Sequence, residues 1–342
     1  MRFADVAGHE AQIARLARAV GEGRVGCGYL LTGPVGIGKR TLARALTARL
    51  VCAMAGASAG GGGGGADACG TCAHCTRVGA GTHPDVRVVT RDEDRRDIRT
   101  EQVRELSRWL ALRPLMAARK VAVIEGADCL NEHGQNALLK TLEEPPGASV
   151  IVLTATRASQ LLPTVRSRCQ HVRLDPLPAP VVSRFLEGRG LPPERAAVLA
   201  ARAEGAPGRA FALADDPHAE LRAAVLAQLA CLDQQHAAQC SALAQRIGKG
   251  PVEPALEATL GWYRDLLGLV LGDGTDALRN PDAAGLLRQA AARATPDRVL
   301  RQLETVCATI DFVERNVNRV LAIETMLLSL RRLEREPAGP PG

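Results

Sequence analysis

Residues 29–41 of this 342-residue chain read YLLTGPVGIGKRT, and this stretch decides the fold. Its first four residues form a short apolar run of the kind found in buried strands, and the glycines that follow predict a tight turn. Residues 42–49 then show the three- and four-residue spacing of a half-buried helix. A strand, a glycine-rich turn and a helix in this order are the context of a phosphate-binding loop, where backbone N–H groups and the positive end of the helix converge on phosphates.

The loop departs from a complete phosphate-binding motif at one position. Lys39 is placed to reach the β- and γ-phosphates of a nucleotide, but the next residue should carry a hydroxyl for Mg²⁺ and is Arg40 instead. Thr41 comes one residue late, which on a helix is a rotation of about 100°. The loop can therefore hold ATP or ADP without hydrolysing it, or it can be a turn that only packs the helix against the sheet. The expected nucleotide contacts are Gly33, Gly36, Gly38, Lys39 and Thr41.

A second nucleotide element departs from its pattern as well. Residues 120–124 predict a buried strand, and the end of such a strand is where an acidic pair would hold the metal and orient the attacking water. The sequence offers Glu125, which keeps a carboxylate, followed by Gly126, which has no side chain to act as a base. The two departures agree, so we expect a poor ATPase.

Strand-like and helix-like segments alternate from about residue 8 to residue 175, which predicts a parallel α/β sheet with crossover helices. The expected strands are residues 29–32, 86–90, 121–125, 150–154 and 169–174. Three prolines between residues 175 and 180 end this alternation, and only helical patterns follow. We expect an α/β module over residues 1–176, a small helical domain over 177–215, a larger helical domain over 216–336 and a frayed tail over 337–342.

Composition limits the function classes. The hydrophobic fraction of 46% predicts a globular core, and the absence of a long apolar run or a secretory leader predicts a cytoplasmic protein. The net charge of +6 permits contact with phosphates but does not require it. With only four Phe, two Trp and two Tyr, a base-stacking platform for single-stranded nucleic acid is not expected.

Four of the ten cysteines have metal-ligand spacing. Two successive two-residue gaps separate three of them, and one lies upstream; the set is Cys52, Cys69, Cys72 and Cys75. Four thiolates close a tetrahedral Zn²⁺ shell, which predicts a structural site without an open position for substrate. A redox pair at Cys72–Cys75 and an iron–sulfur site are the alternatives, and neither has the surrounding pattern that it needs.

The metal module spans about residues 52–83. Within it, the glycine-rich residues 56–66 predict a flexible loop that can bridge the long gap to the first cysteine. His74 and His83 are alternative ligands, and we expect Cys52 to be the fourth ligand in preference to either.

Three further motifs give a family resemblance. Residues 136–146 read NALLKTLEEPP, residues 167–169 read SRC and residues 82–85 read THPD. Together with the loop, they resemble the clamp-loader branch of the AAA+ proteins, specifically over the first half of the chain and by length and order alone beyond it. The resemblance implies a RecA-like AAA+ module with a zinc-binding insertion, an all-α lid and an all-α C-terminal collar domain.

The resemblance also implies a function. Motor subunits of the family, τ/γ, carry a complete loop, so the eroded loop implies a non-hydrolysing stator subunit of the DNA polymerase III clamp loader. The implied partners are τ/γ and δ in a hetero-pentamer, with the β sliding clamp and primed DNA reached through the complex. Polymerase activity would belong to the holoenzyme. The alternative function is an active AAA+ ATPase, and Arg40 and Gly126 are the residues that argue against it.

The motif SRC implies a role for Arg168 as an arginine finger donated in trans to a neighbouring subunit. A lone arginine is more often a surface ion pair, and the motif is what favours the finger. By position, Thr156 and Arg209 resemble the first and second sensor residues. Glu143 and Glu144 are interpreted as solvated charges at the end of a helix.

Overall fold

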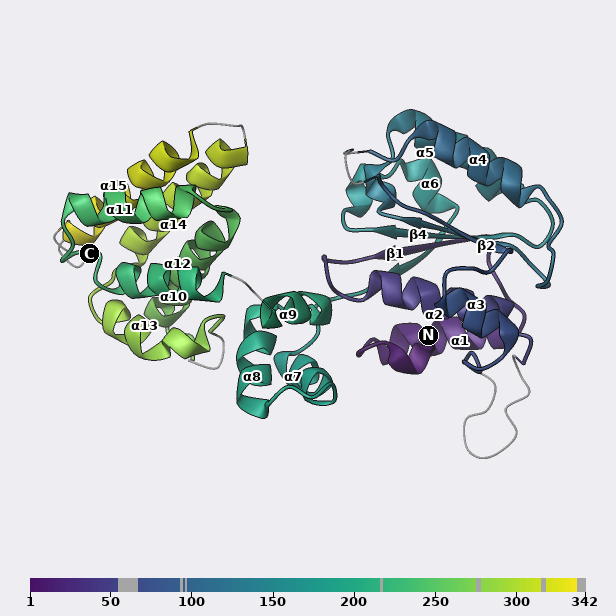
Figure 1. Ribbon diagram of the computed structural model, residues 1–342, viewed down its shortest axis with the longest axis horizontal. Coiled ribbons are helices and arrows are strands. Elements are labelled where there is room, and N and C mark those ends of the chain that lie inside the picture. Colours follow the sequence, from purple (N-terminus) through teal and green to yellow (C-terminus); the bar gives the residue numbers. More distant parts are fainter. Residues whose placement is uncertain are drawn as a thin grey trace. The chain divides into compact units, whose positions relative to one another are not determined.

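The computed structural model describes residues 1–54, 67–92, 95, 97–215, 218–274, 278–314 and 318–336 (Figure 1). The predicted flexible loop at 56–66 and the predicted tail at 337–342 lie outside the described residues. The chain divides into two compact units. The first comprises Met1–Gly190 and Gly205–Ala210; the second comprises Leu191–Glu204 and the chain from Phe211 onward. The helical range 177–215 is thus shared between both units, and the three-domain boundaries stay a prediction.

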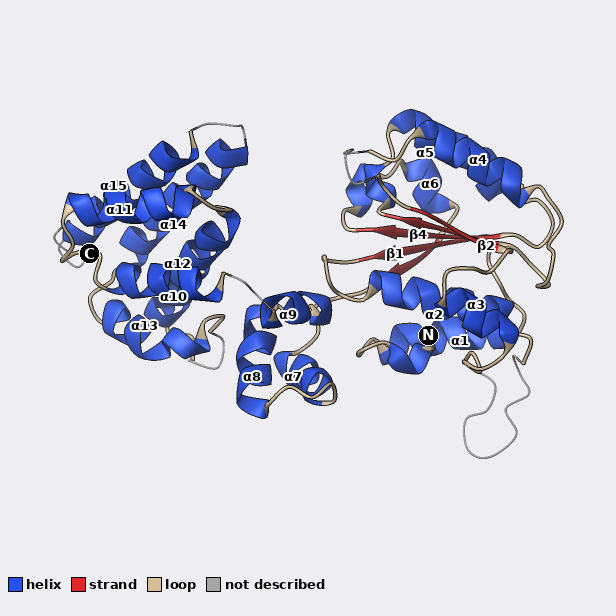
Figure 2. Cartoon of the chain, viewed as in Figure 1, coloured by secondary structure: helices blue, strands red, loops and turns tan. Residues whose placement is uncertain are grey.

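The first unit has a five-stranded parallel sheet with the strand order β2-β3-β4-β1-β5. The strands lie between layers of helices (Figure 2). The strands are β1 (Gly28–Thr32), β2 (Val86–Val89), β3 (Val121–Glu125), β4 (Val150–Ala155) and β5 (Gln170–Arg173). Every residue of the three central strands β1, β3 and β4 is buried, as expected for a parallel sheet covered on both faces. The predicted parallel α/β sheet with crossover helices is confirmed.

Helices cover both faces of the sheet (Figure 1). One face packs against α1 (Glu10–Gly21) and α2 (Lys39–Val51), beside which lies α3 (Ala73–Gly79). The other packs against α4 (Thr100–Leu110), α5 (Glu132–Glu143) and α6 (Pro163–Ser167). Alternate residues of β1 divide between the two cores, since Tyr29 and Leu31 face α2 whereas Leu30 faces α5. The helix α7 (Ala179–Glu187) and the start of α9 (Pro207–Ala214) also belong to this unit.

The second unit contains only helices among its described residues. They are α8 (Pro193–Arg202), α10 (Ala219–Ala230), α11 (Ala237–Gly248), α12 (Glu253–Leu271), α13 (Ala284–Ala291), α14 (Pro296–Glu314) and α15 (Arg319–Arg335). The long helix α12 packs against α10, α13 and α14, and it buries Trp262 and Tyr263 in the core. Within the described parts of both units, no helix is long and apolar enough to cross a membrane.

A buried polar network fixes the segment that leads into α13. The guanidinium of Arg222 donates to Asp282 at 2.6 and 2.9 Å and to the side-chain oxygen of Asn280 at 2.6 Å. Asn280 in turn donates from its backbone and its side chain to the carboxylate of Asp265 on α12. A buried guanidinium with several charge-assisted hydrogen bonds is costly to leave without them, so the network specifies how α10, α12 and this segment pack.

Candidate functional site

The predicted phosphate loop joins β1 to α2, and its backbone requires glycine. Gly33, Gly36 and Gly38 have φ angles of +151°, +79° and +107°, which side-chain-bearing residues rarely adopt. A Cβ on Gly33 would lie 2.4 Å from the carbonyl oxygen of Leu174, and one on Gly36 would lie 2.7 Å from the backbone nitrogen of Arg209. The loop therefore has the backbone that a phosphate site needs.

The ammonium group of Lys39 donates to two carbonyl oxygens of the loop itself. Its Nζ lies 2.6 Å from the oxygen of Gly33 and 2.7 Å from that of Pro34. Burial lowers the pKa of Lys39, and the nearby negative charge of Asp128 opposes that shift. In this structure, Lys39 thus links the start of α2 to the start of the loop.

Arg40 occupies the first turn of α2, where a hydroxyl would hold Mg²⁺, and it forms an ion pair with Glu125. Arg40 Nε lies 2.9 Å from Glu125 Oε2; the arginine side chain is 70% exposed and the glutamate side chain is 3% exposed. The other carboxylate oxygen of Glu125 is buried without a hydrogen-bond partner in the described structure. A guanidinium beside the acidic residue disfavours a divalent cation there by charge repulsion. Thr41 lies one residue further along the same helix.

Gly126 follows Glu125 in the left-handed conformation, with φ of +76°, and its N–H donates to the hydroxyl of Thr154 at 3.0 Å. Glu125 and Thr154 are neighbours in the register of β3 and β4. Glycine at position 126 therefore has a backbone role as well as lacking a base. Sequence reasoning missed this role and missed Thr154, because both depend on strand register.

The two predicted sensor positions are held by backbone contacts. The N–H groups of Thr156 and Arg157 both donate to the carboxylate of Asp128, at 2.9 and 3.0 Å. Arg209 lies at the start of α9, whose Gly208 donates its N–H to the carbonyl of Gly36 at 2.8 Å. The structure thus brings Arg209 beside the loop and ties Thr156 to the segment after β3. Gly208 was not predicted as part of the site.

Arg168 lies in the turn between α6 and β5, and it is paired within the chain. Its NH2 atom lies 2.5 Å from Glu143 Oε1, and its NH1 donates to the carbonyl of Thr164 at 3.0 Å. The Glu143 side chain is 47% exposed, as expected of a solvated charge, and it is also ion-paired, which the sequence did not indicate.

Strand direction places Arg168 and the phosphate loop at opposite ends of the sheet. The loop follows the last residue of β1, whereas Arg168 precedes the first residue of β5, and the two strands are parallel with Tyr29 beside Gln170. Five strand residues span roughly 16 Å. Arg168 therefore cannot serve the loop of its own chain.

The four cysteines predicted as metal ligands converge. Their sulfur atoms all lie within 4.8 Å of one another; the Cys52 and Cys72 sulfurs are 4.0 Å apart, and those of Cys69 and Cys75 are 3.9 Å apart. A tetrahedral Zn²⁺ with bonds of about 2.3 Å needs sulfurs about 3.8 Å apart, so the observed spacing fits. The cluster could hold a metal ion such as zinc.

The pKa values of the cysteines differ within the cluster. Backbone N–H groups, chiefly that of Cys72, lower the pKa of Cys69 to about 6, which favours its thiolate. Burial instead raises the pKa of Cys52 and of Cys75. Burial thus opposes ionisation of these two thiols, and a divalent ion would offset that cost by displacing their protons and neutralising the thiolates that form.

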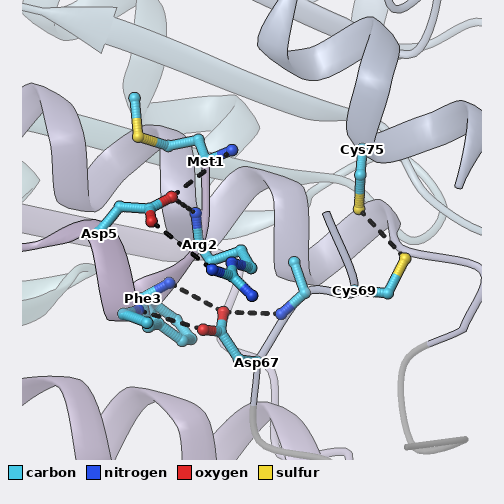
Figure 3. Close-up of polar contacts among 9 residues, drawn as sticks. Met1, Arg2, Phe3, Asp5, Asp67, Cys69 and Cys75 are labelled. Carbon is cyan, nitrogen blue, oxygen red and sulfur yellow. Dashed lines mark hydrogen bonds and ion pairs between the residues drawn. The ribbon is translucent and has the colours of Figure 1, made fainter. Parts of the chain in front are cut away.

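The cluster is anchored to the start of the chain by Asp67 (Figure 3). Its carboxylate accepts the backbone N–H groups of Phe3 at 2.8 Å and Ala4 at 3.1 Å. Two residues later, Cys69 points toward Cys75. This anchor was not predicted, because no short-range pattern links residues 3 and 67.

The two histidines that were considered as alternative ligands bond to each other. His74 Nδ1 and His83 Nε2 are 2.9 Å apart, and His83 Nδ1 accepts the N–H of Asp85 at 3.0 Å. Asp85, which is buried, accepts three backbone N–H groups from residues 115–117. These contacts connect the module to the segment before β3 and engage both ring nitrogens of His83.

Comparisons with known proteins agree with this geometry. The family model described as "DNA polymerase III, delta subunit" matches residues 8–178, and "DNA polymerase III, delta subunit, C terminal" matches residues 217–332. A Pseudomonas aeruginosa protein named DNA polymerase III subunit delta′ is 34% identical over 88% of this chain and 90% of its own length. The chain belongs to the delta′ family.

Two other relatives are matched over different shares of their own lengths. The Escherichia coli delta′ subunit is 29% identical over 77% of this chain and 78% of its own length. The tau subunit from Salmonella typhimurium is 36% identical, but over 54% of this chain and 27% of its own length. The delta′ relatives are thus matched over most of their length, whereas the tau relative shares only a part.

Proposed function

We propose that this chain is the non-hydrolysing delta′ subunit of the DNA polymerase III clamp loader, acting as a stator that helps to place the β sliding clamp on primed DNA. The observation that carries the proposal is the Arg40–Glu125 ion pair, in which a fixed cation lies at the metal position of a loop that otherwise keeps its glycines and Lys39. Static ATP or ADP is compatible with the loop. Hydrolysis is not expected of it, since Arg40 replaces the hydroxyl that would hold Mg²⁺ and Gly126 has no side chain to act as a base.

Family membership supports a proposal for the partners. The chain would assemble with τ/γ and δ in a hetero-pentamer, in the cytoplasm at the nucleoid-associated replisome, and would reach clamp and DNA through that complex. The all-α second unit supplies the collar contacts in this assignment. Polymerase activity is a property of the holoenzyme, and ATP hydrolysis is the work of the neighbouring motor subunits.

Arg168 would act in trans as an arginine finger. Its place at the sheet end opposite its own phosphate loop supports this role, because the guanidinium can face only a site outside the chain's own loop. Arginine is suited to the task, since its planar group can meet phosphate oxygens with two parallel hydrogen bonds. Sensor roles for Thr156 and Arg209 would be structural here, through the backbone contacts that hold both segments near the loop.

The metal of the cysteine cluster would be Zn²⁺ in a structural role. A closed set of four thiolates has no position for a substrate, and the module is fastened to the chain start by Asp67. When bound, the ion would supply folding energy to residues that have a small apolar core of their own.

The test is reconstitution. The chain, mixed with τ/γ and δ, should form a complex whose intact mass contains one copy of it, and that complex should load clamps onto primed DNA. Arg168→Ala should assemble equally well and lower the DNA- and clamp-stimulated ATP hydrolysis of the complex. An arginine finger contributes on the order of 10³–10⁵ at the site that it serves, so the total rate should fall by one site's share. Failure to enter the complex, or a Lys39-dependent ATPase of the isolated chain, would favour an independent AAA+ ATPase instead.

A further inference from the structure

Arg168 and Glu143 form a short ion pair. The guanidinium NH2 lies 2.5 Å from Glu143 Oε1, and the two side chains are 36% and 47% exposed. NH1 donates to the carbonyl of Thr164 at 3.0 Å, so the guanidinium spans the end of α5 and the last turn of α6. Two directions of contact fix the plane of the group, not merely its position.

The backbone beside this pair is closely packed. The neighbours of the two charged residues, Leu142 and Cys169, are both buried, and both pack against Gly28 at the start of β1. A Cβ on Gly28 would lie 2.9 Å from a methyl of Leu142, 3.0 Å from the sulfur of Cys169 and 3.2 Å from the carbonyl oxygen of Arg168. Glycine therefore lets the end of α5 approach the turn, and the approach brings the carboxylate to the guanidinium.

The ion pair with Glu143 leaves N–H groups of Arg168 available for a further hydrogen-bond acceptor. A guanidinium has five N–H groups, and the contacts to Thr164, Ser167 and Glu143 engage at most three of them. An exposed ion pair contributes little stability and is screened by salt, so it is too weak to withhold Arg168 from a triphosphate, which offers charge-assisted hydrogen bonds of its own. The lasting effect of Glu143 is thus on orientation.

We propose that Glu143 is a positioning residue, which orients the Arg168 guanidinium toward the phosphates of a nucleoside triphosphate bound by a neighbouring subunit. The inference rests on the proposed trans role of Arg168. Holding the plane in advance removes rotamer freedom that would otherwise be lost when the phosphate is engaged. The hydrogen bond accepted by Oε1 is what matters, so an amide at position 143 should preserve most of the effect.

The experiment uses the reconstituted clamp loader with five forms of this chain: Glu143→Ala, Glu143→Gln, Glu144→Ala, Arg168→Ala and the double variant Arg168→Ala/Glu143→Ala. Glu144 is the matched control, being exposed and next to Glu143 on the chain. Each is compared with wild type in assembly by size exclusion, in clamp-loading rate on primed DNA and in stimulated ATP hydrolysis.

Glu143→Ala should slow clamp loading about tenfold and by less than Arg168→Ala does. Glu143→Gln and Glu144→Ala should stay within about twofold of wild type, and the double variant should equal Arg168→Ala, because Glu143 acts only through the arginine. A normal rate for Glu143→Ala beside a slow Arg168→Ala would overturn the positioning role alone. Faster loading by both Glu143 variants would also overturn it, because it would show that Glu143 holds Arg168 back from the phosphates. A normal rate for Arg168→Ala would overturn the trans role and this inference together.

Discussion

Arg40 on α2 and Glu125 at the end of β3 are 85 positions apart in the sequence, and their side chains meet at 2.9 Å. The contact joins the two elements that a nucleotide-hydrolysing site would use for its metal. Since the buried carboxylate already has a cationic partner from its own chain, the loop has a charge balance that does not depend on Mg²⁺.

The isolated chain should hydrolyse ATP no faster than its Lys39→Ala variant. Arg40→Ser should not restore activity, because it removes the guanidinium but leaves Gly126 without a base to orient water. Steady-state phosphate release with ATP and Mg²⁺ measures both. Turnover that disappears in Lys39→Ala would contradict the stator assignment, and turnover gained by Arg40→Ser alone would show that the metal position is the sole defect.

Arg40→Ala should destabilise the first unit by about 1–2 kcal/mol, because it leaves the buried Glu125 carboxylate without its cation. The cost should be below the roughly 3–5 kcal/mol of a fully buried pair, since Arg40 is largely exposed. Adding Glu125→Gln should recover most of the loss by removing the unpaired charge.

The measurement is urea unfolding in a Trp262→Phe background, in which Trp109 alone reports on the first unit. Arg44→Ala, an exposed arginine on the same helix, is the control and should change stability by less than about 0.5 kcal/mol. Equal losses in the two arginine variants would mean that the ion pair has no stabilising role.

One Zn²⁺ per chain should copurify, and Cys72→Ser should lose it and unfold at a lower temperature, because a structural metal contributes folding energy directly. Cys307→Ser, at an exposed cysteine far along the sequence, should keep the metal and its melting temperature. Elemental analysis of protein purified without chelator, beside thermal melts, provides the readout. Stoichiometric zinc retained by Cys72→Ser would exclude the four-cysteine site.

The second unit should become less stable as the pH decreases, because of the Arg222–Asp282 ion pair. Burial alone would raise the pKa of Asp282, but the hydrogen bonds and charge of Arg222 outweigh it and hold that pKa below its ordinary value of 3.8. A carboxyl whose pKa is lower when folded stabilises the protein above about pH 4, and that stabilisation is lost as the pH falls through the folded value.

Asp282→Asn should therefore be less stable than wild type at pH 7, and the difference should shrink below about pH 4. Unfolding free energies from pH 3 to 7 in a Trp109→Phe background, with Trp262 as reporter, test this. Asp311→Asn, at an exposed position on α14, serves as the control. If the difference in unfolding free energy between Asp282→Asn and wild type did not change with pH, the ionised carboxylate would not be its cause.

The three central strands β1, β3 and β4 were predictable because each is a short, mainly apolar run, which a parallel sheet covered on both faces requires. The four cysteines were predictable from spacing alone. The ion pairs of Arg40 and Arg168 were not, because each depends on which strands are neighbours and on how closely two helices can approach. Gly28 is the clearest case: in the sequence it stands just before the predicted strand at residues 29–32, but in the fold it is the first residue of β1 and allows Leu142 and Cys169 to approach.

Gly36 and Gly208 meet main chain to main chain, with the N–H of one 2.8 Å from the carbonyl of the other. A Cβ on Gly208 would lie 2.9 Å from that carbonyl oxygen, so even alanine at this position would push the two segments apart. Such a junction has no side chain that could change rotamer and absorb a displacement. Movement at the start of α9 must pass directly into the phosphate loop, and the reverse also holds. The loop thus has a mechanical connection to α9 that does not depend on a bound nucleotide, and this connection alone requires glycine at positions 36 and 208.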